Sequence, residues 1–238
     1  MGDVMKLYVS NLSKSFHQKE VLKEIDYTFS DNKIYGLIGK NGAGKTTFFN
    51  CLNEDIKKDS GRITLEYDDI KIPLTSNDIG YVISTPIVPE FLTGREFIEF
   101  FMEVNKDRIE NLKDIDYYFD LVKLSVEDQN KLLKDYSHGM KNKIQLLIII
   151  IENPKVILLD EPLTSIDIVV QEDLKELWKK MKKDHIFIFS THILDLALDL
   201  CDEVVILNNQ KLELIEKKDL NTKKYKDKII KELRDSNV

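Results

Sequence analysis

The first third of the chain divides short runs of β-branched and aromatic residues by polar turns, which is the pattern of β-strands. One more run of this kind follows, and two prolines then interrupt regular structure. The strands predicted in this part of the chain are residues 6–9, 25–29, 33–39, 62–67 and 79–84.

Helical spacing begins at residue 93, where Phe97, Phe100, Phe101 and Val104 recur along one predicted face. Residues 112–122 repeat the pattern. The stretch 139–151 is ambiguous, because its four consecutive isoleucines favour a strand on propensity alone. Its length and the stop that Pro154 supplies favour a helix. We interpret it as a buried helix.

The last part of the chain alternates apolar strands with helices. Strands are predicted at 155–160, 185–190 and 202–208, and helices at 171–183 and 191–201. Buried apolar strands that alternate with helices are typical of a mostly parallel sheet covered on both faces. The pattern therefore predicts an α/β protein.

Composition narrows the possible functions. The 238 residues are 42% apolar and 32% charged, which predicts a folded protein with a sizeable core. A net charge of −7 argues against broad nucleic-acid binding, so we expect no nucleic-acid partner. Cys51 and Cys201 are expected to be buried free thiols. The most apolar run, residues 144–151, is far shorter than the roughly 18 residues of a membrane span, and no secretory signal is visible.

The segment GKNGAGKTT follows a predicted strand and precedes a helix expected to begin near Thr46. It fits the phosphate-loop pattern G-x-x-x-x-G-K-[ST]. Glycines allow positive φ values and let backbone N–H groups surround phosphate oxygens. Lys45 is expected to reach the β- and γ-phosphates, and the Thr46 hydroxyl to ligate Mg²⁺. The loop residues predicted to bind a nucleotide are Gly39, Asn41, Gly42, Gly44, Lys45, Thr46 and Thr47.

A second motif is an apolar strand that ends in Asp160 and Glu161. It brings two carboxylates to the carboxyl end of the predicted sheet, where ligands bind in such folds. Asp160 is expected to join the metal shell of Mg²⁺, and Glu161 to act as general base for the attacking water. Two acids after a strand also occur as a solvated turn. Beside a phosphate loop they indicate nucleotide hydrolysis.

In their order along the chain these motifs resemble the nucleotide-binding subunit of ABC transporters, over nearly the whole chain. Residues 135–143 look like the family signature, with Ser137 and Gly139 at its key positions, whereas Tyr136 and His138 depart from its commonest form. A Ser followed by a Gly at a helix start forms an N-terminal anion site. The resemblance implies that Ser137 and Gly139 contact the γ-phosphate held by the opposite subunit.

Three more positions take their expected roles from the resemblance. Asp167 resembles the acid of the loop that follows the carboxylate pair. His192 resembles the family's switch histidine, which could hydrogen-bond the γ-phosphate or position Glu161. Phe16 resembles the aromatic residue that stacks on adenine, with core packing as the alternative. Solvated or core roles are expected for the remaining histidines, which are His17, His138 and His185.

Ser84 stands where most members of the family have a glutamine that touches Mg²⁺ and water and faces the membrane partner. Serine is shorter by about two bonds, so it could reach the metal only through water. Either hydrolysis or its coupling to the partner is weakened, or the loop is realigned and another residue serves. The sequence leaves both alternatives open.

The expected fold class is α/β, a P-loop NTPase core with a mostly parallel sheet, an N-terminal antiparallel β subdomain and an inserted α-helical subdomain. The resemblance implies a single ABC ATPase domain over residues 1–238. Within it, a helical subdomain is expected at about 86–140 and a C-terminal helical tail at about 217–238.

The resemblance implies an ATPase that uses ATP and Mg²⁺, closes as a homodimer or heterodimer, and drives a separate transmembrane permease subunit. That subunit is expected near Ser84 and residues 93–104. The small size and the GMK of the signature look more like exporters of drugs or antimicrobial peptides, at the cytoplasmic face of a bacterial membrane. Two alternatives stay open: a soluble ABC ATPase, for example of the iron–sulfur assembly type, and a nucleotide-sensing module with low turnover.

Overall fold

The computed structural model describes residues 4–109, 111–163 and 168–215. A central sheet runs through the molecule, with its strands in the order β10-β9-β3-β8-β7-β6. Neighbouring strands are parallel except β10, which pairs antiparallel with β9. Its strands are β3 (Lys33–Ile38), β6 (Ile79–Val82), β7 (Val156–Asp160), β8 (Ile186–Thr191), β9 (Glu203–Asn208) and β10 (Lys211–Ile215).

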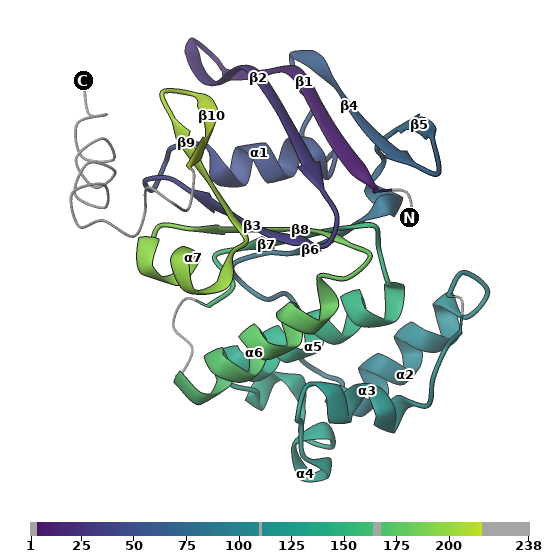
Figure 1. Cartoon of the computed structure of the whole chain (residues 1–238). Helices are drawn as coiled ribbons and strands as arrows, with labels where there is room; N and C mark the ends of the chain where they lie inside the picture. The colour runs from purple at the N-terminus through teal and green to yellow at the C-terminus, as the bar shows by residue number, and fades with distance from the viewer. Residues whose placement is uncertain (1–3, 110, 164–167, 216–238) are drawn as a thin grey trace.

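A second sheet is antiparallel, in the order β2-β1-β4-β5, and lies above the central sheet with helix α1 (Lys45–Leu52) between them (Figure 1). Its strands are β1 (Lys6–Phe16), β2 (Lys19–Ser30), β4 (Ser60–Tyr67) and β5 (Ile70–Pro73). The space around α1 is filled by aromatic rings, including Phe29, Tyr35, Phe48 and Phe49, all fully or almost fully buried.

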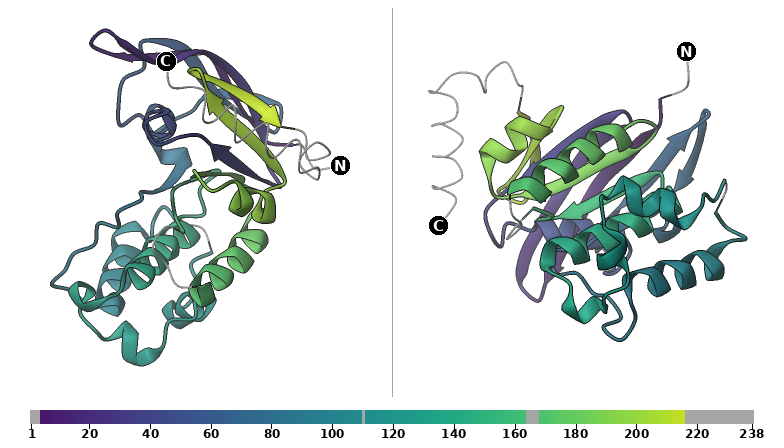
Figure 2. Two further views of the ribbon diagram at one scale, coloured as in Figure 1. Left: turned by 90° about the vertical axis from the view of Figure 1, so that its left-hand side faces the viewer. Right: turned by 90° about the horizontal axis from the view of Figure 1, so that it is seen from below.

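The other helices lie on the opposite face of the central sheet (Figures 1 and 2). They are α2 (Gly94–Asn105), α3 (Ile115–Leu121), α4 (Val126–Gln129), α5 (His138–Glu152), α6 (Ile168–Met181) and α7 (Leu194–Leu200), with the short 3₁₀ turns η1 (Ser76–Asp78) and η2 (Leu133–Asp135). Helix α5 confirms that the isoleucine run is helical. Its two ends are an N-cap serine, Ser137, and a left-handed Asn153.

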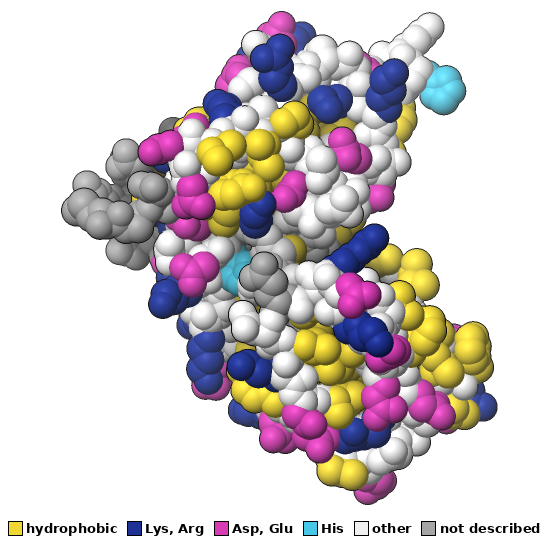
Figure 3. Space-filling model, turned by 90° about the vertical axis from the view of Figure 1, so that its right-hand side faces the viewer, with side chains coloured by type: hydrophobic (Ala, Val, Ile, Leu, Met, Phe, Trp, Pro, Cys, Tyr) yellow, Lys and Arg dark blue, Asp and Glu magenta, His cyan; other side chains and the backbone are white. Residues whose placement is uncertain are grey.

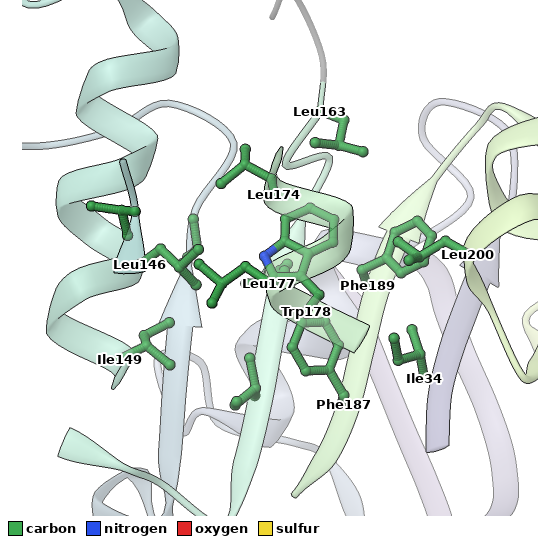
Figure 4. Close-up of a cluster of buried hydrophobic side chains, with 14 of the residues drawn as sticks. Ile34, Leu146, Ile149, Leu163, Leu174, Leu177, Trp178, Phe187, Phe189 and Leu200 are labelled. Carbon is green, nitrogen blue, oxygen red and sulfur yellow. The ribbon is translucent and has the colours of Figure 1, made fainter. Parts of the chain in front are cut away.

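The central sheet has a hydrophobic core on each of its two faces, because successive side chains of a strand point to opposite faces. On β8, Ile186 and Ile188 pack around α1, whereas Phe187 and Phe189 pack against the helices. Figure 4 shows Phe187 and Phe189 beside Trp178 of α6, whose ring is 2% exposed. The predicted sheet covered on both faces is confirmed. Cys51 and Cys201 are buried free thiols, as expected.

The face of α2 differs from the prediction. Ile98 is fully buried, whereas Phe100 and Val104 are 62% and 63% exposed. The helical spacing was right, but several apolar positions stand on the outer side, since a helix that is apolar over a wide arc can bury only the part that meets its neighbours. The sequence also did not predict β5 and β10, which are short and largely exposed edge strands.

The helices α2 to α4 and η2 lie between β6 and α5 in the chain and stand apart from both sheets (Figure 1). The boundaries of a helical subdomain at about 86–140 stay a prediction. The tail at 217–238 lies outside the described residues. Within the described part of the chain, no helix has both the length and the apolar character that crossing a bilayer requires.

Candidate active site

The phosphate loop joins the end of β3 to the start of α1, as predicted. Gly42 and Gly44 have φ values of 80° and 108°, a region that glycine enters without steric cost. Gly44 is the N-cap of α1, and a Cβ built there would lie 2.8 Å from the Val21 side chain. The predicted positive φ values are therefore confirmed at two positions of the loop.

Lys45 has a buried ammonium group and is only 6% exposed. Its Nζ donates to the carbonyl oxygen of Gly39 at 2.7 Å and to that of Lys40 at 3.2 Å. The carboxylate of Glu161 lies 3.4 Å away. A buried charge needs such partners. Phosphate oxygens that entered the loop would meet this positive charge directly.

Thr46 and Asp160 come together although 114 positions separate them, since the Thr46 hydroxyl donates to Asp160 Oδ2 at 2.7 Å. Hydroxyl and carboxylate oxygens are the ligands that Mg²⁺ prefers, usually with phosphate oxygens completing its shell. Among the described residues no group of three or more His, Cys, Asp or Glu side chains could hold a metal ion. A site with one carboxylate fits a magnesium ion that arrives with a nucleotide.

Glu161 lies one residue beyond β7 with a φ of 51°, an uncommon value for a residue with a Cβ. Its carboxylate oxygen Oε2 lies 2.8 Å from Nδ1 of His192. Its backbone N–H donates to the hydroxyl of Ser190 at 3.0 Å. Strand β7 thus brings Asp160 to the hydroxyl of Thr46 and Glu161 to the ring of His192.

One cleft of about 620 Å³ is lined by Lys45, Thr46, Asp160, Glu161 and His192 together with other residues. Its volume is within the usual size range of small-molecule sites. Figure 3 shows the surface narrowed between the β-rich upper part of the molecule and the helical lower part. The residues that line the cleft are Phe16, Val21, Lys40, Asn41, Gly42, Gly44, Lys45, Thr46, Thr47, Ser84, Thr85, His138, Asp160, Glu161 and His192.

Phe16 stands at the rim of this cleft and is 44% exposed, so core packing does not explain it. The ammonium of Lys14 lies over its ring, 5.1 Å from the centroid. The Asp59 carboxylate accepts a hydrogen bond from the Ser15 backbone N–H at 2.6 Å and lies 3.3 Å from that ammonium. The hydrogen bond from the Ser15 backbone is the main cause of the lowered pKa of Asp59, and the Lys14 ammonium lowers it further. An anchored, half-exposed ring offers a face for stacking.

Ser137 and Gly139 do not line the cleft of their own chain. Ser137 is exposed and caps α5, accepting a hydrogen bond from the Met140 backbone N–H at 3.2 Å. Gly139 is buried in the first turn of α5. The structure therefore leaves these two signature residues outside the lining of the cleft, although His138 between them lines it.

Four cleft residues and one buried residue were missed by the sequence reasoning. Among them, Lys40 stands at a variable position of the phosphate-loop pattern. Val21 and Thr85 carry no motif, and His138 was expected to be solvated or in the core, whereas it is half-buried at the cleft. Ser190 contacts the carboxylate of Asp160 and the backbone N–H of Glu161. Its position just before the switch-like Thr191-His192 was the one signal available. Asp167 lies outside the described residues.

The other two histidines behave as expected. His17 is exposed on the turn between β1 and β2. His185 is buried, and its Nδ1 lies 2.6 Å from the carbonyl oxygen of Pro154. Burial lowers the pKa of His185, which keeps the ring neutral at physiological pH. Neither ring lines the cleft.

Comparison with known proteins gives the class. Residues 22–164 match the family model described as ABC transporter. An uncharacterized ABC transporter ATP-binding protein of Methanocaldococcus jannaschii is 33% identical over 208 residues, 87% of this chain and 75% of that protein. A solved structure titled as an ATP binding subunit of an ABC transporter covers 96% of this chain and 99% of its own, with a TM-score of 0.78 and 23% identity.

Other relatives differ in the direction of transport that their names state. The lipopolysaccharide export system ATP-binding protein LptB of Haemophilus influenzae is 28% identical over 216 residues, 87% of this chain and 88% of LptB. A probable sulfate/thiosulfate import ATP-binding protein CysA of Chlorella vulgaris is 29% identical over 214 residues, 87% of this chain and 89% of CysA.

The chain belongs to the ABC transporter family, as an ATP-binding subunit with ATPase activity. Subunits of this family associate with transmembrane permeases. The predicted fold class, a P-loop core with an antiparallel N-terminal sheet, is confirmed.

Proposed function

We propose that this subunit binds ATP with Mg²⁺ in a head-to-tail dimer, hydrolyses it, and thereby drives export through a separate permease. The observation that carries the proposal is the cleft, which gathers groups from the ends of β1, β3, β7 and β8. Its ammonium, hydroxyl and two carboxylates are what phosphoryl transfer to water requires, namely charge neutralisation, metal ligands and a base.

For nucleotide binding, we assign the phosphates to the backbone of the loop and to Lys45. Asn41, Gly42 and Thr47 line the cleft beside them. Phe16 takes the base, since its exposed ring stands at the rim. The electrostatic attraction of Lys45 acts where water is largely excluded, which strengthens it. Binding of the triphosphate would draw the Lys45 ammonium from the Gly39 carbonyl and from Glu161, and so release Glu161.

Thr46 and Asp160 fit Mg²⁺ by chemistry and by their 2.7 Å contact. When bound, the ion would neutralise charge on the phosphate oxygens. Ser84 also lines the cleft and is exposed, so it suits a contact through water rather than direct ligation. This assignment keeps Ser84 near the metal while explaining how a short side chain could replace a longer one.

Hydrolysis is assigned to Glu161 as general base. Its hydrogen bond to His192 directs one carboxylate oxygen, and the other faces Lys45. A base that is held by a second side chain is oriented before water arrives. Of the two roles expected for His192, the structure favours the one in which its ring keeps Glu161 in place.

A dimer is supported by the exposure of Ser137 at the start of α5, outside the cleft of its own chain. A capped helix start with a neighbouring glycine offers N–H groups to an anion. In a head-to-tail pair, whether of identical or related chains, Ser137 and Gly139 would meet the γ-phosphate bound by the other subunit.

We propose that the permease binds near Ser84 and α2, because apolar side chains are exposed there. Figure 3 shows hydrophobic side chains on the surface of the helical part of the molecule. The exposed apolar side chains close to Ser84 in sequence and on α2 include Ile87, Phe91, Phe100 and Val104, which are 62% to 79% exposed. Exposed apolar groups of this number mark an interaction surface, because water contacts them unfavourably.

The partner is tested with a photo-crosslinking amino acid at Phe100, with Ile70 of β5 as a control position that is also apolar and exposed. In membranes of the source cell, position 100 should capture a protein with several membrane spans, identified by mass spectrometry, and position 70 should not.

The direction of transport is tested by deleting the gene, which should raise sensitivity to drugs or antimicrobial peptides if transport is outward. Loss of uptake of a nutrient with unchanged sensitivity would instead indicate import.

A further inference from the structure

Ser190 is a polar residue in the most buried part of the central sheet. It lies near the end of β8, after four apolar residues, and is 0% exposed. In the parallel pair β7–β8 it stands opposite Asp160. A hydroxyl without partners in such a place destabilises the fold, so its hydrogen bonds matter.

This hydroxyl donates one hydrogen bond and accepts another, and both bonds go to the candidate catalytic acids. Ser190 Oγ donates to Asp160 Oδ1 at 2.5 Å and accepts from the backbone N–H of Glu161 at 3.0 Å. A hydroxyl has one proton, so the N–H from Glu161 leaves that proton for Asp160. Oδ1 of Asp160 is therefore the atom that accepts the Ser190 proton.

The bond to Asp160 decides which oxygen faces the cleft. Because Oδ1 is held by Ser190, Oδ2 is the oxygen that meets the Thr46 hydroxyl. Hydrogen bonds from behind a metal-binding carboxylate orient it and tune its affinity for the ion. Ser190 is in this position relative to the oxygens that we assign to Mg²⁺.

The bond to Glu161 holds an unusual backbone. A φ of 51° is sparsely populated by residues that have a Cβ, and the surrounding structure must stabilise it. The N–H held by Ser190 belongs to this residue. In that conformation the carboxylate reaches His192 and Lys45.

We propose that Ser190 is a positioning residue for ATP hydrolysis: one buried hydroxyl aligns the carboxylate of Asp160 for Mg²⁺ and the backbone of Glu161 for its role as base. The inference rests on the proposed function, which gives these two acids their roles. Ser190 itself does not line the cleft and touches no substrate.

The test is Ser190→Ala in the full chain, with turnover measured as Mg²⁺ is titrated. We expect kcat to fall about 10- to 100-fold and the Mg²⁺ concentration for half-maximal rate to rise about tenfold. ATP affinity in EDTA should stay within about twofold, because Lys45 and the loop backbone do not contact Ser190. Ser190→Thr keeps the hydroxyl and should restore most of the Mg²⁺ response.

Tyr35→Phe is the matched control, since it removes the hydroxyl of a buried residue that accepts a backbone N–H, from Ser30 at 2.8 Å, and Tyr35 does not line the cleft. It should lower thermal stability without changing the Mg²⁺ dependence. An unchanged Mg²⁺ dependence in Ser190→Ala, or an equal defect in Ser190→Thr, would overturn the inference. If Ser190→Ala does not fold, Ser190→Cys, with a weaker donor of similar size, is judged by the same measurements.

Glu161→Gln separates this inference from the proposed function. If Glu161→Gln loses activity while Ser190→Ala behaves as wild type, only the role of Ser190 is wrong. If Glu161→Gln itself turns over ATP at the wild-type rate, the assignment of the base is wrong, and with it the reason for positioning Glu161.

Discussion

The two parts of the nucleotide machinery in this chain differ in how complete they are. At the phosphate loop, Lys45, Asp160 and Glu161 are held by contacts within the chain, and the groups that could meet a nucleotide converge on one cleft. At the start of α5, Ser137 is exposed and its hydroxyl is bonded to the N–H of Met140 in its own helix.

In the proposed dimer, the loop is a site preorganised within one chain, whereas the signature end is half of a site that a second molecule completes. Changes in the loop that weaken ATP binding should therefore be visible in a single chain. Changes at the signature should be visible only when two chains close on ATP. The four predictions below test this division.

The largest effect is expected for Glu161→Gln, which keeps the shape of the side chain but removes the base. Turnover should fall about 100- to 10,000-fold, as when a general base is lost, while ATP binding persists. The variant should accumulate as an ATP-bound dimer in size-exclusion chromatography. Glu213→Gln, on the exposed side of β10, should behave as wild type. A variant that stays strictly monomeric with ATP and Mg²⁺ would contradict the composite site.

Lys45→Ala should weaken ATP binding by about 10- to 100-fold, since one charge-assisted hydrogen bond to a buried group is lost. The defect should be the same at protein concentrations too low for dimers, because the loop belongs to one chain. Equilibrium binding of a fluorescent ATP analogue measures it. Lys211→Ala on β10 is the control. If Lys45→Ala bound ATP with wild-type affinity, Lys45 would not be part of the nucleotide site.

Ser137→Ala should reduce turnover by about tenfold and leave ATP binding by the single chain unchanged. The loss of the helix cap itself costs about 1 kcal/mol. Ser125→Ala controls for that cost, because Ser125 caps α4 through the same kind of bond, to the Asp128 N–H at 3.2 Å. Equal turnover in the two variants would mean that Ser137 acts only as a cap.

Mixing chains sharpens this third prediction. Ser137→Ala chains mixed with Lys45→Ala chains form some dimers in which one site has an intact loop and an intact signature. Activity should then exceed the sum of the separate variants. No gain on mixing, with dimers present, would indicate that both residues serve the same chain's nucleotide.

The smallest effect is expected for Phe16→Ala, which removes a ring at the rim of the cleft. ATP affinity should fall about threefold to tenfold, the worth of one aromatic stacking contact. Phe16→Tyr keeps a stacking face and should stay within about twofold of wild type. GTP affinity should fall by a similar factor, because a ring face accepts either base. Unchanged affinity in Phe16→Ala would remove the ring from base recognition.

Several elements could be predicted from the sequence because their causes are local. The glycine positions of the phosphate loop, the helix after them and the cap at Ser137 depend on backbone conformations within a few residues. The apolar strands β3, β7, β8 and β9 are also visible locally, as continuous runs. The edge strands β5 and β10 are only four and five residues long and largely exposed, too short for their pattern to be recognised.

Other features depend on how distant parts of the chain meet. The exposed side of α2, with Phe100 and Val104, cannot be told from its buried side until its neighbours are known. His138 reaches the cleft because the start of α5 lies close to the ends of the strands. No spacing along the chain encodes these positions.

By itself the sequence determined the family, the α/β class and the order of the motifs, since each motif is a short segment with its own turn or periodicity. Only the tertiary structure decided that Ser190 holds Asp160 and Glu161 from behind. Ser190 follows Asp160 by 30 positions and Glu161 by 29. The two hydrogen bonds exist because β7 and β8 pair in one register. Strand register is fixed by packing on both faces of the sheet, and a shift of one residue would turn Ser190 away from the acids.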